Sequence, residues 1–184
     1  VQIASKLKSP FKRIIIGGLG LCVLIFLFPP LYGEGYETLM YLFSKNPENI
    51  LNYSILFSFS DNIFTFIIFI ILIILLKAYA VGLTTASGGV GGVFAPSLFL
   101  GGLTGFLFAV ILNTAHIGSV SQRNFALVGM AGVMSAVMHA PLTAIFLIAE
   151  ITGGYGLFIP IIVTATFAYI TIYRFEKHSI YTKK

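Results

Sequence analysis

Residues 63–96 read IFTFIIFIILIILLKAYAVGLTTASGGVGGVFAP, and this stretch decides the fold class of the chain. Its first part, residues 63–83, is uncharged except for Lys77 and can cross the roughly 30 Å hydrocarbon layer of a membrane as a helix. A lone segment in lipid must satisfy its own backbone hydrogen bonds, so we predict a helix rather than the strand that many isoleucines favour in water. A glycine cluster at residues 88–92 then interrupts the apolar sequence.

The composition of the whole chain is that of a membrane protein. Of its 184 residues 58% are hydrophobic and 9% are charged, with a mean hydropathy of +0.99. Soluble domains carry roughly 25% charged residues. This balance excludes intrinsic disorder, a nucleic-acid-binding module and a disulfide-stapled secreted domain. The single cysteine, Cys22, lies in an apolar run, and we expect a buried, inert thiol there.

Other apolar runs predict further membrane helices. We expect them at residues 14–32, 97–113 and 157–173. A short amphipathic piece at residues 36–43 is expected at the membrane interface. The run at residues 125–150 is interrupted by His-Ala-Pro at residues 139–141, which predicts two short helices. We therefore predict an all-α, polytopic membrane protein with broken and re-entrant helices, a pattern typical of transport sites.

The small residues predict how the helices pack, and the basic residues predict how the chain is oriented in the membrane. Small residues recur four apart at Gly101, Gly105 and Ala109, and at Gly132, Ala136 and Ala140, a spacing that suits close helix packing in lipid. Basic residues lie outside the first and last apolar runs, at Lys6, Lys8, Lys12, Arg13, Arg174, Lys177, Lys183 and Lys184. By the positive-inside rule, we expect both ends of this multi-pass integral membrane protein in the cytoplasm.

Residues 91–96, Gly-Gly-Val-Phe-Ala-Pro, form the sharpest candidate site. Pro96 fits the first turn of a helix, so the amides of the three residues before it are expected at a helix N-terminus. Such an end carries about half a positive elementary charge and binds anions. No Lys or Arg is near in sequence, and a full charge would hold an anion too tightly for transport. The other interpretation is that the glycines only let helices cross closely.

Residues 92–96, GVFAP, resemble the GxFxP motif of the CLC family of chloride channels and chloride/proton antiporters. Residues 129–153, which contain APLT and EIT, are similar to the next two helices of that family. Ile-Pro at 159–160 and the helix after it also fit. Residues 178–181, His-Ser-Ile-Tyr, resemble the short segment that bears the pore tyrosine of the family. The likeness runs from about residue 14 to the end of the chain.

The resemblance implies a chloride site and its ligands. The amides of Val93, Phe94 and Ala95 would bind chloride, and the Tyr181 hydroxyl would donate to the same ion from the cytoplasmic side. By itself, Tyr181 would be interpreted as an interfacial tyrosine. Structural motif positions are Gly91, Gly92, Pro96 and Glu150. Chloride is both ligand and substrate, with no cofactor, no metal and no catalytic residue expected.

The resemblance also implies how the chain is completed. Residues 1–184 would be a single domain, the C-terminal half of the CLC membrane domain and its second inverted repeat. The GSGIP and GxEGP motifs and the inner proton-transfer glutamate of the first repeat are absent from the sequence. The chain is therefore expected to need the N-terminal repeat of the same protein, and to form a homodimer in lipid without nucleic acid. The sequence does not decide between a channel and an antiporter. The alternative from another class is a non-conducting membrane scaffold or truncated pseudo-transporter.

Isolated polar residues in apolar runs have competing interpretations. A carboxylate in an apolar helix suggests a functional role by default, but Glu150 directly precedes a helix end, where it can reach the interface or bond to backbone amides, so we expect a structural role. It is not the gating glutamate of the family. Ser135 and His139 are four apart, which could suggest an intramembrane serine protease. Same-helix geometry is poor for that chemistry and G-x-S-x-G is absent, so we expect no enzyme. Lys77 is expected to extend its charged end to the interface.

Overall fold

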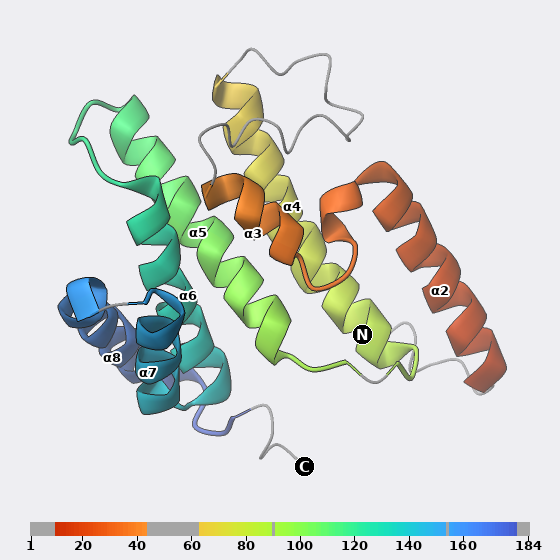
Figure 1. Cartoon of the computed structure of the whole chain (residues 1–184). Coiled ribbons are helices and arrows are strands. Elements are labelled where there is room, and N and C mark those ends of the chain that lie inside the picture. Colours follow the sequence, from red (N-terminus) through yellow and green to blue (C-terminus); the bar gives the residue numbers. More distant parts are fainter. Residues whose placement is uncertain (1–9, 44–62, 90, 154, 180–184) are drawn as a thin grey trace. The chain divides into compact units, whose positions relative to one another are not determined.

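The computed structural model describes residues 10–43, 63–89, 91–153 and 155–179. Within these ranges the regular elements are helices and no strand occurs, which confirms the all-α prediction (Figure 1). The α-helices are α2 (Pro10–Leu27), α3 (Tyr36–Phe43), α4 (Ile63–Ala86), α5 (Phe94–Thr114), α6 (Gln122–Met138), α7 (Pro141–Ile151) and α8 (Phe158–Phe175), and the 3-10 turns are η1 (Pro29–Leu31) and η4 (Tyr155–Leu157). The chain divides into two compact units, Val1–Pro96 and Ser97–Lys184, and each is described by itself.

In the first unit, α2 ends earlier than the predicted 14–32 segment. Phe28 leaves the helical conformation, with φ −132° and ψ 81°, because a residue before proline disfavours the helical region. The two prolines then open η1, whose Leu31 is buried. The expectation of a buried Cys22 is wrong, since its side chain is exposed on α2.

Helix α4 packs antiparallel against α2 through glycines. Gly17 of α2 lies against Ser87, just after α4, and Gly20 lies against Leu83. The predicted 63–83 helix is confirmed and extends to Ala86. On α4, a buried face contains Phe66, Phe69, Ile70 and Ile73.

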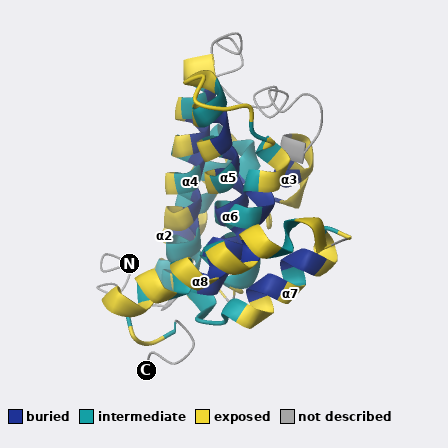
Figure 2. Ribbon diagram, turned by 90° about the vertical axis from the view of Figure 1, so that its left-hand side faces the viewer, coloured by how far each residue is buried: buried dark blue, intermediate teal, exposed yellow. Residues whose placement is uncertain are grey.

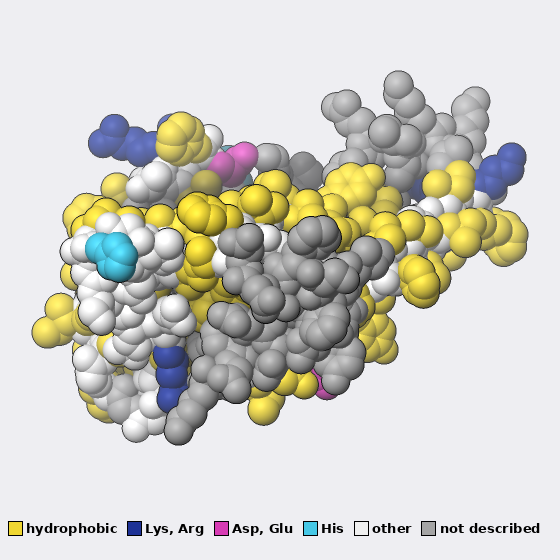
Figure 3. All heavy atoms as spheres, turned by 90° about the horizontal axis from the view of Figure 1, so that it is seen from above, with side chains coloured by type: hydrophobic (Ala, Val, Ile, Leu, Met, Phe, Trp, Pro, Cys, Tyr) yellow, Lys and Arg dark blue, Asp and Glu magenta, His cyan; other side chains and the backbone are white. Residues whose placement is uncertain are grey.

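The described helices are suited to lipid. Three segments are long and apolar enough to cross a membrane, namely Ile63–Ala86, Phe94–Thr114 and Tyr155–Phe175. Large apolar side chains are exposed, and Phe26 and Phe175 show 82% and 83% of their surface. Figure 3 shows many hydrophobic and few charged side chains on the face in view. The chain is therefore an integral membrane protein, because such a surface is stable in lipid rather than in water.

In the second unit, α5 and α6 cross with their backbones in contact. A Cβ added at Gly101 would lie 2.7 Å from the Cα of Met130, and one added at Gly129 would lie 2.9 Å from the Cα of Gly105. Real Cβ atoms do not approach so closely. The first predicted row of small residues therefore serves close packing. Its main partner is Gly129, which does not belong to the second predicted row of small residues, Gly132, Ala136 and Ala140.

The break at residues 139–141 is confirmed. Helix α6 ends at Met138, His139 adopts a left-handed conformation with φ 55°, and Pro141 starts α7. Helices α6, α7 and α8 pack on one another, and Gly132 of α6 lies against Thr164 of α8. Helix α8 has few buried residues, Ile161 and Ala165, and is mostly yellow and teal in Figure 2.

The glycine crossing predicts a stability effect. Gly129→Val should lower the free energy of unfolding by about 1–3 kcal/mol, because the added atoms force α5 and α6 apart. Gly18→Ala is the matched control, since a Cβ there meets nothing within 4 Å. Chemical denaturation in detergent micelles measures both. Equal stability of the two variants would contradict the close crossing.

Candidate functional site

Helix α4 ends in a glycine-dependent cap. Gly88 has a φ of +92°, and its N–H donates to the Thr85 carbonyl at 3.2 Å while the Gly89 N–H donates to the Thr84 carbonyl at 3.0 Å. These two bonds are those of a Schellman motif, which satisfies carbonyls that the helix leaves without partners. Thus Gly88 stops α4 at a defined place, directly before the candidate site.

The next helix begins within the GVFAP motif. The predicted start at residue 97 is wrong, because α5 already begins at Phe94, with Ala95 and Pro96 in its first turn. Proline is tolerated there because first-turn amides have no helical carbonyl to bind. Val93 is the residue directly before the helix. The amides of Val93, Phe94 and Ala95 thus lie where the sequence placed them, at the N-terminal end of a helix.

Gly91 and Gly92 leave the approach to this helix end open. Both are exposed, and a Cβ added to either would meet none of the described atoms within 4 Å. Neither has the positive φ that requires glycine. Within this unit, close helix crossing is therefore not what these two glycines provide. Their lack of side chains instead leaves backbone accessible beside the first turn of α5.

A cavity of about 210 Å³ borders the motif. Its wall includes Gly91, Gly92 and Pro96 on one side and Lys77 with the turn residues Leu31 and Gly33 on another. All of these residues belong to the first unit. The cavity brings a cation to the glycine motif from a residue that is distant in sequence. Sequence reasoning missed this neighbour, although the lone charge on an apolar helix was a signal.

Lys77 does not extend to the interface, so that expectation is wrong. Its side chain is 3% exposed, and its Nζ donates to the carbonyls of Leu31 at 3.1 Å and Gly33 at 2.8 Å. The turn after α2 supplies these acceptors because η1 ends there and leaves its carbonyls directed at α4. Among the described residues, Lys77 is the buried side chain that carries a charge.

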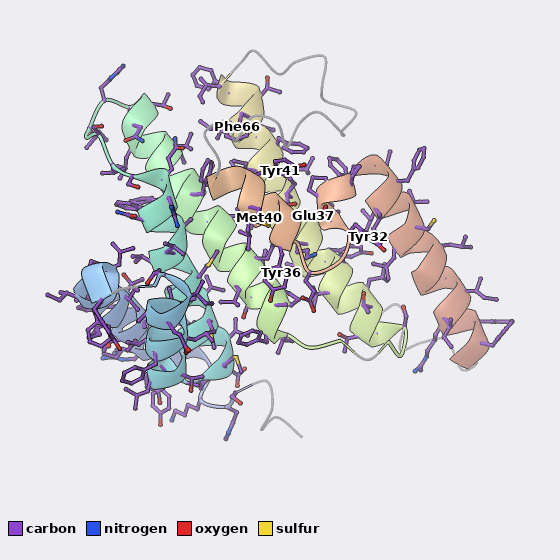
Figure 4. All side chains as sticks on the ribbon, viewed as in Figure 1. Tyr32, Tyr36, Glu37, Met40, Tyr41 and Phe66 are labelled. Carbon is purple, nitrogen blue, oxygen red and sulfur yellow. The ribbon has the colours of Figure 1, made fainter. Side chains whose placement is uncertain are left out.

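A larger cavity, of about 820 Å³, lies beside α3 in the same unit. Its wall includes Tyr32 on the loop after η1, and Tyr36, Glu37 and Tyr41 on α3, which Figure 4 labels together. Glu34 also lines it, and its described lining holds no Lys or Arg. Two carboxylates repel an anion. The smaller cavity is therefore the better candidate for an anion site.

The other sequence candidates fall elsewhere. Glu150 is exposed in the last turn of α7, where its backbone carbonyl accepts from the Gly153 N–H at 3.0 Å. Ser135 Oγ donates to the Ala165 carbonyl at 2.7 Å, and His139 Nε2 lies 3.0 Å from the Glu176 carbonyl. Because the two side chains have separate partners, this geometry does not support a serine activated by His139. Tyr181 lies outside the described residues.

Membrane-crossing helices, a capped break and a helix N-terminus at a cavity define an integral membrane protein with broken helices. A family model described as voltage gated chloride channel matches residues 2–173 of the chain. The chain therefore belongs to the voltage-gated chloride channel, or CLC, family. The match ends before Tyr181.

Curated relatives support the same family. A putative chloride channel protein ClcB-like from Ralstonia nicotianae is 27% identical over 172 residues, which are 93% of this chain and 36% of the relative. The voltage-gated ClC-type chloride channel ClcB of Escherichia coli strain SMS-3-5 is 28% identical over 180 residues, or 97% of this chain and 38% of the relative.

A plant relative extends the range of organisms. The chloride channel protein CLC-e of Arabidopsis thaliana is 27% identical over 159 residues, 80% of this chain and 20% of the relative. The chain thus spans well under half the length of each of these relatives. No solved structure gives a significant match.

The cap before the site predicts a difference between neighbouring glycines. Gly88→Ala should lower the free energy of unfolding by about 1–2 kcal/mol, because a left-handed conformation is unfavourable for a residue with a Cβ. Gly91→Ala is the control and should stay within about 0.5 kcal/mol of wild type. Thermal denaturation in detergent compares them. A more damaging Gly91→Ala would show that the α4 cap is not the sensitive point.

Proposed function

We propose that the protein containing this chain transports chloride across a membrane, as a channel or as a chloride/proton antiporter. Chloride is held by the amides of Val93, Phe94 and Ala95 at the start of α5. The proposal is supported by family membership and by relatives whose names describe chloride channels. Their printed names do not distinguish the two modes of transport for this chain.

The open first turn of α5 is the observation that carries this proposal. A 21-residue helix directs about half a positive elementary charge at its N-terminus, and Gly91 and Gly92 place no side chain in front of it. A partial charge suits transport, because the ion must bind well enough to lose water and weakly enough to leave. Backbone dipoles therefore give the site its positive potential.

The complete pore is proposed to need more than this chain. The longer relatives support a requirement for the N-terminal repeat of the same protein, with residues 1–184 as the C-terminal half of the membrane domain. We propose a homodimer in lipid, with both ends of this segment in the cytoplasm. The exposed Lys12, Arg174 and Lys177 at the two ends of the described chain fit that topology.

Chloride should stabilise the complete gene product. At 100 times its dissociation constant, a ligand of the native state adds about 2.7 kcal/mol to stability. Gly92→Ala should keep the stability measured without halide but weaken chloride binding about tenfold, or about 1.4 kcal/mol, because its Cβ occupies the approach to the amides. Thermal melting across a chloride titration, with gluconate balancing ionic strength, measures both effects.

The same titration tests the alternative. A membrane scaffold or truncated pseudo-transporter should show no stabilisation that is specific to halide. Such a result, together with no chloride flux from reconstituted vesicles, would overturn the proposed function. Equal chloride affinity of wild type and Gly92→Ala would instead indicate that chloride does not bind at this helix end.

Tyr181 is proposed to donate its hydroxyl to the bound chloride. Tyr181→Phe should weaken chloride binding by about tenfold or more, the effect of one hydrogen bond to a charged group. Tyr173→Phe is the matched control, because Tyr173 lies on α8 with 48% of its surface exposed. Calorimetric titration of chloride compares the two. Unchanged affinity and unchanged flux in Tyr181→Phe would reject the role.

A further inference from the structure

His139 has a backbone conformation that is unfavourable for a residue with a side chain. It lies directly after α6 with φ 55° and ψ 33°, in the left-handed region. Glycine is the common residue in this conformation at a helix end, because a Cβ makes the conformation costly. A residue other than glycine in such a conformation points to a use for its side chain. The contacts of the imidazole identify that use.

The imidazole of His139 is held against α8 at two points. Its Nε2 lies 3.0 Å from the backbone carbonyl oxygen of Glu176, the residue at which α8 ends. Its ring meets the ring of Tyr169 edge-on, with centroids 5.9 Å apart and planes at 87°. Tyr169 precedes Glu176 by about two helical turns, so the two lie on the same side of α8. The side chain therefore joins the break after α6 to one side of α8.

The surroundings of the ring determine the role of each nitrogen. A carbonyl oxygen can only accept, so Nε2 carries the hydrogen and donates to the Glu176 carbonyl. Nδ1 is buried and has no hydrogen-bond partner within the described part of the chain. A hydrogen on Nδ1 would therefore be buried without an acceptor, which is costly. The neutral ring with its hydrogen on Nε2 fits both observations, and His139 is a donor directed at Glu176.

The hydrogen bond from His139 fixes the end of α8. Glu176 is extended, with φ −138° and ψ 114°, and its N–H donates to the Ile172 carbonyl at 2.8 Å. Its carbonyl lies at a helix end, where backbone acceptors have no partner in the helix. Because His139 holds this carbonyl, it sets the direction in which the chain leaves α8. Tyr181 follows five residues later, within ~18 Å along an extended chain, so the position of Glu176 restricts the region that Tyr181 can reach.

We propose that His139 is a positioning residue for the chloride site. Its Nε2–H anchors the end of α8 at Glu176, and this anchor orients the residues that follow so that the Tyr181 hydroxyl can donate to chloride. His139 acts through Tyr181 and does not bind the ion itself. The inference rests on the proposed role of Tyr181 and deepens it.

Ser135 provides a comparison with a hydrogen bond that only supports packing. It is buried on α6, about one turn before His139, and its Oγ donates to the Ala165 carbonyl of α8 at 2.7 Å. Both side chains thus donate to the backbone of α8. The Ser135 bond lies in the body of that helix, whereas the His139 bond lies at its end. If both bonds only supported packing, neither loss would act selectively on the residues after α8.

The first measurement is hydrogen exchange of the complete gene product in detergent, followed by mass spectrometry of peptides from residues 174–184. His139→Asn keeps a residue type that tolerates the left-handed conformation, but its side chain is too short to replace Nε2. Exchange in these peptides should become about fivefold faster, the effect of one lost hydrogen bond. His139→Gln places an amide donor at the reach of Nε2 and should restore slow exchange. Ser135→Ala should leave exchange in these peptides unchanged.

The second measurement is a calorimetric titration of sodium chloride into the same protein at constant ionic strength. His139→Asn should weaken chloride binding about threefold, less than Tyr181→Phe, because the hydroxyl is displaced rather than removed. His139→Gln and Ser135→Ala should bind chloride as wild type does. In combination with Tyr181→Phe, His139→Asn should cause no further loss, because substitutions that act through one contact are not additive.

Unchanged exchange in His139→Asn, or equally fast exchange in Ser135→Ala, would overturn the anchor. Additive losses of affinity from His139→Asn and Tyr181→Phe would overturn its action through Tyr181. Should His139→Asn not fold, His139→Phe replaces it in both measurements, since it keeps a ring beside Tyr169 and lacks the donor.

The proposed function and this inference can fail separately. A wild-type protein that binds no chloride removes both, and unchanged binding in Tyr181→Phe removes the role of Tyr181 together with this inference. Weakened binding in Tyr181→Phe with wild-type binding in His139→Asn removes this inference alone.

Discussion

The requirement that backbone polar groups be satisfied inside a membrane governs this structure. Between α4 and α5 the chain leaves helical geometry, so the last carbonyls of α4 need partners outside the helical ladder. The Schellman bonds at Gly88 and Gly89 satisfy carbonyls at the end of α4. The Nζ of Lys77 does the same for the turn after α2. These hydrogen bonds allow the helical structure to be interrupted, and the candidate site lies at the interruption.

Packing in the second unit follows a different rule, because lipid gives little hydrophobic drive for one helix to bind another. Contact between α5 and α6 instead depends on the absence of side chains at Gly101, Gly105 and Gly129, which brings the backbones together. The hydrogen bond from Ser135 to the Ala165 carbonyl adds a polar contact between α6 and α8. Close approach and one directed bond thus replace the apolar driving force of a soluble core.

Local signals predicted local structure well, whereas contacts distant in sequence were missed. Helix α3 occupies the predicted residues 36–43, and proline fixed the break at 139–141, because both depend on short-range pattern. Lys77 was misplaced, since its carbonyl acceptors lie more than 40 residues earlier in the chain. The start of α5 was placed at residue 97 from the apolar run, three residues later than Phe94, although Pro96 was correctly expected in the first turn of a helix. The helix-end position of residues 93–95 was predictable, but the neighbouring cation was not.

The bare backbone at Gly91 and Gly92 has a consequence for how the site can diverge. A wall made of side chains can be enlarged or reduced by substitution, but a wall without side chains can only gain atoms. If the proposed anion role holds, evolution has little freedom to change ion preference at these two positions. Under the same proposal, adaptation to another anion is more accessible at the opposite wall, where Leu31 and Lys77 have side chains that can be replaced.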